Sequence, residues 1–369
     1  MIIGVDGNEA NVREKVGVSM YTLKLLEYFQ RVSNESNQFI VFLRENPRDE
    51  LPFQTAYFKY RVIKGSFLWS QISLPLHLFF SRFFKNRINI FFSPAHYAPR
   101  FSFCPTVVTI LDLSYFYYPQ EFLKKDLYKL TRWTQYSVFK AKKIITVSKT
   151  TKKDLIKYYP AVESKITVIY NGMDREINEN STPSTNFKSL KSQKYILYVG
   201  TLQPRKNIVT LIRAFRLFHT NHPEYKLVIA GKRGWLFDLI FKEAQDLYVN
   251  ENIIFPGYVS DEELIVLYKN AFCFVLPSFY EGFGIPILES MSYRCPVIAS
   301  FNSSLPEVGG DACLYIDPYK PEDIVDKLEL LLKDKTLRKE LIKKGKERMF
   351  FFSWTKCGKE TLELLQSSV

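Results

Sequence analysis

The feature that most constrains the fold of this chain is a repeated alternation of short apolar segments with longer amphipathic ones. Strand-like apolar segments occupy residues 2–6, 38–44, 60–65, 88–94, 105–111, 143–148 and 165–171 in the first half, and 195–202, 225–231, 252–258, 272–278, 296–300 and 313–317 in the second. Helical patterns, such as those over 18–30 and 121–142, lie between several of them. Short apolar strands interleaved with helices of about 10–15 residues are typical of parallel sheets with helices on both faces. The sequence therefore predicts an α/β protein.

The length of the chain, 369 residues, favours two domains over a single hydrophobic core. Residues 178–193 are polar, lack periodicity and carry Ser, Thr and Asn, so they are the best candidate for a linker. We expect a first domain over 1–177 and a second over 194–354, followed by a short amphipathic helix over 355–369 that could pack on either domain.

Three helix starts follow from local signals. Ser260 with Glu263 three positions later has the pattern of a capping box. Pro321 stands at a plausible first helical position, and Asn207 can cap the amphipathic segment that follows it.

The net charge of +13 is concentrated in the first half of the chain. Residues 1–180 hold 26 Lys and Arg against 16 Asp and Glu, whereas residues 181–369 hold 25 against 22. A basic face attracts anionic lipid, nucleic acid or phosphorylated substrates, although a solvated helix face has the same composition. An anionic inner leaflet could be contacted by aromatic side chains that alternate with cations here, namely Trp69, Phe79, Phe80, Phe83 and Phe84 with Arg82, Lys85 and Arg87.

The compartment expected for this chain is the cytoplasm. The start "MIIGVDGNEA" lacks the basic and apolar regions of a signal peptide, and no apolar run approaches the roughly 20 residues that span a bilayer. Five cysteines stand singly, which suits a reducing compartment.

The stretch "YVGTLQPRKN" has the features of an anion site. It ends a strand, turns at Gly200, presents Arg205 and Lys206, and then begins a helix. In an open parallel sheet, ligands bind outside the carboxyl ends of the strands. Two cations beside the free amides of a helix start suit a phosphate, although an exposed Arg-Lys pair in a loop remains an alternative.

The stretch "SFYEGFGIPILES" brackets a glycine-rich turn with Glu281 and Glu289. Carboxylates only accept hydrogen bonds, so these side chains suit a ligand rich in hydroxyl groups. Gly282 and Gly284 allow close approach of a ligand, and helix-start amides of Ile285, Ile287 and Leu288 could point at a phosphate. A diphosphate flanked by hydroxyl-bearing rings describes a nucleotide sugar, while a plain strand-to-helix turn with surface acids is the alternative.

Two further observations concern the ligand. The backbone of Gly257, Tyr258 and Val259 in "FPGYVS" could pair with the edge of a base. No two aspartates have Asp-x-Asp spacing, so no metal site and no cofactor are expected, and the two cations with helix amides can stabilise a departing diphosphate.

Together these motifs resemble the retaining GT-B glycosyltransferases of family 4. The resemblance rests on "YVGTLQPRKN", "LVIAGKRGW", "IIFPGYVSDEELIVLY" and the run from "VLPSFYEGFGIPILES" to "CLYIDP", and more loosely on "DGNEANVREKVGVSMYTLKLLE" and "VIYNGMD". It implies two Rossmann-like domains facing across a cleft, with the C-terminal helix packed back on the first. It also implies metal-independent transfer with retention of configuration.

The resemblance assigns roles to matching residues. Arg205 and Lys206 would hold the donor diphosphate, Glu281 the hydroxyls of the transferred sugar, and Glu289 the ribose. Donor contacts are also implied for Gly17, Phe283, Gly284 and Ile285. The sequence patterns described above add Gly200, Tyr258 and Val259 to the expected donor contacts. The "QPRKN" stretch is similar to members that transfer mannose from GDP-mannose, with a UDP-sugar as the alternative donor. The acceptor would be a lipid-linked or growing oligosaccharide of a surface polysaccharide.

One position departs from the family pattern. Leu111 stands where the family commonly has a histidine that contacts the donor sugar, just before Asp112. His96 could reach the site instead, so His96 and Asp112 are candidates for a sugar or acceptor contact. Two rival functions stay open, a catalytically silent nucleotide-sugar binder because of Leu111, and a nucleic-acid-binding protein because of the charge.

Overall fold

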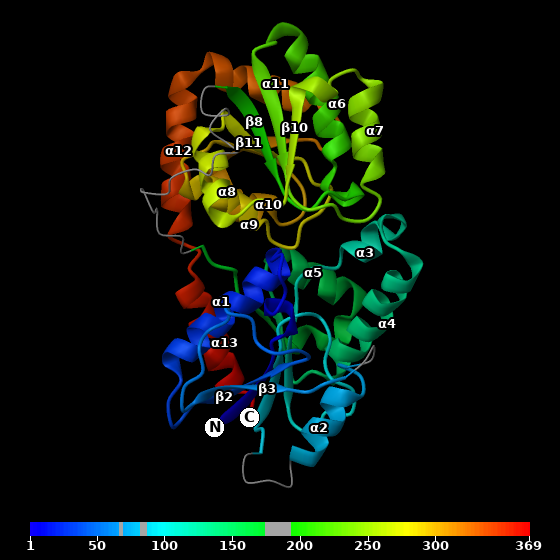
Figure 1. Cartoon of the computed structure of the whole chain (residues 1–369), viewed down its shortest axis with the longest axis vertical. Helices are drawn as coiled ribbons and strands as arrows, with labels where there is room; N and C mark the ends of the chain where they lie inside the picture. Colours follow the sequence, from blue (N-terminus) through cyan, green and yellow to red (C-terminus); the bar gives the residue numbers. More distant parts are fainter. Residues whose placement is uncertain (66–68, 82–86, 174–192) are drawn as a thin grey trace. The chain divides into compact units, whose positions relative to one another are not determined.

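The computed structural model describes residues 1–65, 69–81, 87–173 and 193–369, which form two compact units (Figure 1). Unit 1 consists of Met1–Gly172 and Phe352–Val369, and unit 2 of Met173–Phe351. The expected linker, residues 178–193, lies outside the described residues except for Gln193.

Unit 1 is built on a seven-stranded parallel sheet with the strand order β3-β2-β1-β4-β5-β6-β7. Its strands are β1 (Ile2–Asp6), β2 (Gln38–Leu43), β3 (Phe58–Val62), β4 (Ile90–Ser93), β5 (Thr106–Ile110), β6 (Lys143–Thr146) and β7 (Ile166–Val168). Its helices are α1 (Gly17–Val32), α2 (Ser73–Ser81), α3 (Ser114–Tyr117), α4 (Lys124–Lys140), α5 (Lys149–Tyr158) and α13 (Trp354–Gln366).

Unit 2 is built on a six-stranded parallel sheet with the order β10-β9-β8-β11-β12-β13. Its strands are β8 (Lys194–Val199), β9 (Tyr225–Ala230), β10 (Ile253–Gly257), β11 (Cys273–Leu276), β12 (Val297–Ser300) and β13 (Cys313–Ile316). Its helices are α6 (Ile208–Asn221), α7 (Asp238–Asp246), α8 (Asp261–Asn270), α9 (Ile285–Ser292), α10 (Leu305–Gly309), α11 (Pro321–Lys333) and α12 (Lys335–Met349).

These sheets confirm the predicted fold class, since all thirteen expected strands are present and every pairing is parallel. In each sheet the strand order reverses beside the first strand of the unit, between β1 and β4 and between β8 and β11. Right-handed crossovers on either side of such a switch point place helices on both faces of the sheet. The switch point is also where the carboxyl ends of the strands leave a crevice for a ligand.

The C-terminal helix α13 packs against α1 within unit 1. The ring centroids of Tyr21 and Trp354 lie 6.2 Å apart, and Arg31 donates a hydrogen bond to the Thr355 hydroxyl at 3.2 Å. A Cβ atom on Gly358 would lie 2.3 Å from the ring of Tyr28. Only glycine therefore permits α13 to approach α1 this closely.

Two of the three predicted helix starts are confirmed. The Ser260 hydroxyl accepts from the Glu263 amide while the Glu263 carboxylate accepts from the Ser260 amide, a complete capping box for α8. Pro321 is the first residue of α11.

The expectation that Trp69 contacts a membrane is wrong. Its side chain is 1% exposed and packs with Leu74 and Leu78 of α2 in the core, and its indole N–H donates to the Ile63 carbonyl at 2.8 Å. Of the other expected membrane contacts, Arg82, Phe83, Phe84 and Lys85 lie outside the described residues.

Candidate active site

The centre of the candidate site is a cluster of Arg205, Lys206 and Glu281 at the switch point of the second sheet. Arg205 and Lys206 belong to a 3-10 turn (Pro204–Lys206) after β8, and Glu281 follows β11, the neighbouring strand. Lys206 Nζ donates to Glu281 Oε1 at 2.6 Å and to Oε2 at 2.8 Å, and Arg205 Nη1 lies 3.5 Å from Oε2. The structure thus brings together three residues that the sequence analysis assigned to one ligand.

The cluster is buried and carries a net positive charge. Glu281 and Arg205 are each 8% exposed, and Ser278 donates to Glu281 Oε1 at 2.7 Å. Burial acts to raise the pKa of the Glu281 carboxyl, but the charges of Lys206 and Arg205 outweigh it, so this pKa lies below its ordinary value. Two cations contact this one carboxylate, so the three side chains together carry a net positive charge, which favours an anionic ligand.

Residues that sequence reasoning missed hold the backbone of the glycine-rich turn. The Ser304 hydroxyl donates to the carbonyls of Glu281 and Phe283 at 2.8 and 2.9 Å. The Ser303 hydroxyl accepts from the Glu281 amide at 3.0 Å, and the Asn302 side chain donates to the Phe279 carbonyl at 2.9 Å. These residues follow β12, which neighbours β11. Their only sequence signal is a polar run directly after a strand.

The turn ends at Gly284, where the chain enters α9. Gly284 has φ +105°, and a Cβ atom there would lie 2.8 Å from a methyl group of Leu305, so both the backbone and the packing require glycine. Phe283 is buried, and Ile285 is the first residue of α9. The expectation that the Ile287 amide is free for a phosphate is wrong, because it donates to the Gly284 carbonyl at 3.0 Å.

Asn207 does not cap α6 with its side chain, which corrects the third predicted helix start. Its backbone is left-handed, with φ 57° and ψ 35°, and this conformation aims the side-chain amide away from the helix. The amide instead donates to the carbonyls of Pro277 and Pro318 at 3.0 and 2.6 Å. Asn207, which directly follows the two cations in the sequence, therefore connects the segments after β8, β11 and β13.

Other predicted donor contacts lie at the carboxyl ends of strands in unit 2. The Gly200 amide donates to the Ala230 carbonyl at 3.0 Å, and the segment Tyr258–Val259 follows β10 with the Tyr258 side chain 46% exposed. Glu289 lies just over one turn into α9, where its Oε2 accepts from the hydroxyl of the buried Tyr268 at 3.2 Å.

The candidates in unit 1 lie at the carboxyl edge of the first sheet. Gly17 is the first residue of α1, and a Cβ atom on it would meet open space. His96 and Asp112 follow the neighbouring strands β4 and β5. Burial lowers the pKa of the His96 imidazole, and the Asp112 carboxylate acts in the opposite direction. Among the described residues, His96 Nδ1 has no hydrogen-bond partner.

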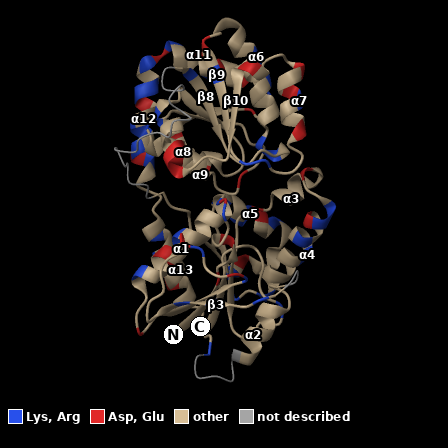
Figure 2. Ribbon diagram, viewed as in Figure 1, with Lys and Arg blue, Asp and Glu red and all other residues tan. Residues whose placement is uncertain are grey.

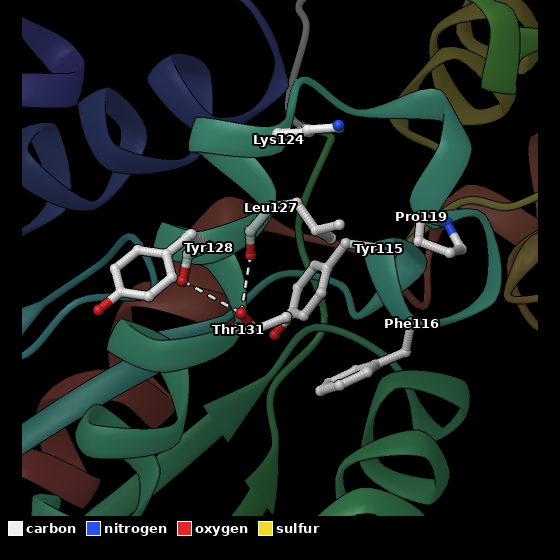
Figure 3. A pocket seen from close by; sticks show the side chains of 7 residues that line it. All are labelled: Tyr115, Phe116, Pro119, Lys124, Leu127, Tyr128 and Thr131. Carbon is white, nitrogen blue, oxygen red and sulfur yellow. Dashed lines mark hydrogen bonds between the residues drawn. The ribbon is translucent and has the colours of Figure 1, made fainter.

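Unit 1 also contains a pocket of about 430 Å³ that the sequence analysis did not foresee (Figure 3). It lies between α4 and the segment that contains α3. Its lining residues are Tyr115, Phe116, Pro119, Lys124, Leu127, Tyr128 and Thr131. Leu127 packs against the core cluster that contains Tyr115, and Figure 3 shows these two side chains close together. The lining is mostly apolar and aromatic, with one cation.

Two features are absent from the part of the chain that the structure describes. No three His, Cys, Asp or Glu side chains among the described residues are grouped closely enough to hold a metal ion. None of the described helices is long and apolar enough to cross a bilayer.

Comparison with known proteins identifies the family. Residues 16–177 match the family described as Glycosyltransferase Family 4, and residues 182–348 match Glycosyl transferases group 1. O-antigen chain mannosyltransferase B of Escherichia coli is 36% identical over 262 residues, which are 69% of this chain and 68% of that protein. The chain is a family 4 glycosyltransferase.

Solved structures agree with this assignment at the level of the fold. Sucrose-phosphate synthase from Thermosynechococcus elongatus superposes with a TM-score of 0.75 at 19% identity, covering 99% of this glycosyltransferase and 98% of that chain. The HepE protein of Anabaena, solved in complex with UDP and glucose, gives 0.72 at 15% identity, covering 99% of both chains. Two parallel-sheet α/β domains with such neighbours confirm the GT-B fold class of the glycosyltransferase.

Proposed function

We propose that this glycosyltransferase transfers mannose from GDP-mannose, with retention of configuration, to a hydroxyl group of a lipid-linked or growing oligosaccharide. The acceptor would belong to a surface polysaccharide. The Escherichia coli relative, whose name states that it is an O-antigen chain mannosyltransferase, supports the choice of sugar and pathway. The observation that carries the proposal is the buried cluster of Arg205, Lys206 and Glu281 at the switch point of the second sheet.

In this proposal, unit 2 binds the donor. Arg205 and Lys206 neutralise the diphosphate, and each charge-assisted hydrogen bond is worth about 1.5–3 kcal/mol. Glu281 then has two tasks, because it already pairs with Lys206 and would also accept hydrogen bonds from sugar hydroxyls. Glu289 would accept from the ribose, and the backbone of Tyr258 and Val259 would meet the base.

The reaction proposed is a front-face displacement without a metal ion. The acceptor hydroxyl attacks the anomeric carbon on the face from which the diphosphate leaves. A new carbon–oxygen bond forms while the bond to the phosphate oxygen breaks, and the hydroxyl proton passes to that oxygen. Arg205 and Lys206 would stabilise the negative charge that develops on the leaving group.

Unit 1 would bind the acceptor. The pocket between α3 and α4 offers aromatic surfaces and the Lys124 cation, which suit an oligosaccharide with an anionic group. Gly17, His96 and Asp112 are the candidates in unit 1 for a further contact with the acceptor or the transferred sugar. We place the enzyme in the cytoplasm, at the inner face of the membrane, because a lipid-linked acceptor would be presented there.

The test is a panel of nucleotide sugars, screened by thermal shift and then by product formation. GDP-mannose, UDP-glucose, UDP-galactose and UDP-N-acetylglucosamine should be compared at equal concentration, since a ligand that binds the native state raises its apparent stability. We expect GDP-mannose to give the largest shift and the α-linked product with an oligosaccharide acceptor.

Each other outcome would decide against one part of the proposal. A larger thermal shift with a UDP-sugar would show that this sugar nucleotide, and not GDP-mannose, is the donor. A β-linked product would exclude retention, and loss of turnover with a chelator would exclude metal independence. Tight donor binding without transfer or donor hydrolysis would favour the catalytically silent nucleotide-sugar binder. That alternative is based on Leu111, which stands where the family commonly has a histidine. Salt-dependent binding to nucleic acid without any donor binding would favour a nucleic-acid-binding function instead.

A further inference from the structure

Three aromatic residues follow three neighbouring strands at the carboxyl edge of the second sheet. Phe279 follows β11, Phe301 follows β12 and Tyr319 follows β13, and β12 lies between the other two strands. The ring centroids of Phe279 and Tyr319 lie 5.0 Å apart, with an angle of 27° between the ring planes. Tyr319 is 64% exposed in this stack, Phe301 is 57% exposed and Phe279 is partly exposed. We name these three residues the aromatic edge.

Hydrogen bonds connect the aromatic edge to the candidate donor site. The Phe279 amide donates to the Arg205 carbonyl at 3.0 Å, and the Phe279 carbonyl accepts from the Asn302 side chain at 2.9 Å. The Asn207 side chain donates at 2.6 Å to the carbonyl of the residue directly before Tyr319. These bonds fix the backbone of the aromatic edge beside the cations that would hold the diphosphate.

The position of the aromatic edge can be compared with the order of the proposed donor contacts along the sheet. The base would lie after β10, the diphosphate after β8 and the transferred sugar after β11. In the strand order β10-β9-β8-β11-β12-β13, the ends of β12 and β13 come next, and the proposed donor contacts do not use them. A second sugar ring beside the transferred sugar would therefore meet the aromatic edge.

The chain around Phe301 and Tyr319 carries little net charge. Residues 301–306 include no charged residue, and Asp317 and Lys320, which flank Tyr319, form an ion pair with each other at 3.5 Å. Helix α12 of the same unit is, by contrast, rich in Lys and Arg (Figure 2). An aromatic surface with balanced charges favours a neutral ligand over an anionic one.

We propose that the aromatic edge is a subsite for a neutral hexose ring of the oligosaccharide acceptor. This inference rests on the proposed function, and it adds a subsite in unit 2 to the pocket in unit 1. One face of a pyranose ring consists of C–H groups, whose partial positive charge is attracted to the negative face of an aromatic ring. The Asp317 carboxylate, which accepts from the Tyr319 amide at 3.0 Å, supplies a hydrogen-bond acceptor for the sugar hydroxyls.

The experiment is a fluorescence titration of the full chain with α-linked mannotriose as the probe. Tyr319→Trp keeps an aromatic face at this position and adds a fluorophore there. The matched control is Tyr248→Trp, since Tyr248 is an exposed tyrosine of unit 2 that follows α7. We expect a saturable change in the difference in fluorescence between Tyr319→Trp and wild type. The difference between Tyr248→Trp and wild type should stay constant.

A second substitution in the Tyr319→Trp protein tests whether the stacked pair binds the sugar. Phe279→Leu removes one aromatic ring but keeps an apolar side chain, and Phe350→Leu is its control because Phe350 is an exposed phenylalanine of unit 2. We expect the Kd for mannotriose to rise roughly 3–10-fold with Phe279→Leu only, as for the loss of one aromatic contact. The Kd for GDP-mannose, measured by calorimetry, should stay unchanged with both.

Three results would overturn the inference. The first is a fluorescence response at position 319 that is absent or no larger than at position 248, and the second is an unchanged Kd for mannotriose with Phe279→Leu. The third is weaker binding of GDP-mannose with Phe279→Leu, which would assign the ring to the transferred sugar. GDP-mannose binding without a response at position 319 would remove the aromatic edge and leave the proposed function standing, whereas loss of donor binding in wild type would count against the proposed function itself.

Discussion

The Glu281→Gln substitution tests whether the buried cluster exists in solution as described. Glu281 accepts hydrogen bonds from Lys206 at 2.6 and 2.8 Å and from Ser278 at 2.7 Å, with the Arg205 guanidinium at 3.5 Å. Glutamine has the same shape but no charge, so two buried cations would face a neutral amide. Removing one partner of a buried ion pair costs about 3–5 kcal/mol.

The expected loss lies at the lower end of that range, about 3 kcal/mol. The reason is that the three charged side chains keep 10–16% exposure, so water partly solvates the uncompensated charge. The measurement is the free energy of unfolding in urea. Lys206→Met alone should cost less, because Arg205 and Glu281 then balance one another.

A double-mutant cycle with Lys206→Met and Glu281→Gln makes the test specific. The double variant should lose at least about 1 kcal/mol less than the sum of the two single losses, since residues in direct contact are coupled. Additive losses, within about 0.5 kcal/mol, would show that the Lys206–Glu281 pair does not form in solution.

Three further perturbations follow from the same contacts. Because the pKa of Glu281 is lowered in the folded state, the stability that its charge contributes is complete above the ordinary glutamate pKa, about 4.3, and is lost at lower pH. The difference in unfolding free energy between wild type and Glu281→Gln should therefore shrink as the pH falls below that value, and a difference that grows would be contradictory. Asn207→Gly removes two hydrogen bonds and should lower the free energy of unfolding by about 1–3 kcal/mol. Asn207→Ala should lower it by about 1 kcal/mol more, because the left-handed backbone is unfavourable for alanine. Leu127→Trp should fill the pocket between α3 and α4 and raise the KM for the acceptor without changing donor binding. The control is Lys125→Trp, which does not line the pocket and should leave the acceptor KM unchanged. Equal acceptor KM values for the two variants would show that the pocket is not part of the acceptor site.

The strands and the candidate cations could be predicted because both depend on local patterns. A short apolar run between helical patterns is recognisable without tertiary information, and the carboxyl end of a parallel strand is a known place for a ligand. The type and position of Arg205, Lys206 and Glu281 therefore sufficed to select them. Their mutual ion pair did not follow, because it joins residues 75 positions apart and depends on which strands become neighbours.

The wrong expectations also concern contacts between residues that are distant in the sequence. Asn207 stands where a capping residue would stand, but its left-handed backbone turns the amide toward two carbonyl groups that arrive from residues 277 and 318. Trp69 is close in sequence to cations and aromatic residues. Its indole N–H nevertheless donates to the Ile63 carbonyl, and its ring packs in the core of unit 1. Sequence periodicity over a helix as short as α2 cannot tell which apolar side chains are covered. Leu74 and Leu78 of α2 are buried, whereas Leu76 and Phe80 are exposed.

The most direct test of the donor site is calorimetric titration of GDP-mannose into wild type, Lys206→Met and the control Lys339→Met, which removes an exposed lysine of α12. Loss of one charge-assisted hydrogen bond, about 1.5–3 kcal/mol, predicts a Kd roughly 10–100 times higher for Lys206→Met and an unchanged Kd for the control. A folded Lys206→Met protein that binds the donor as tightly as wild type would contradict the assignment of the diphosphate to this cluster.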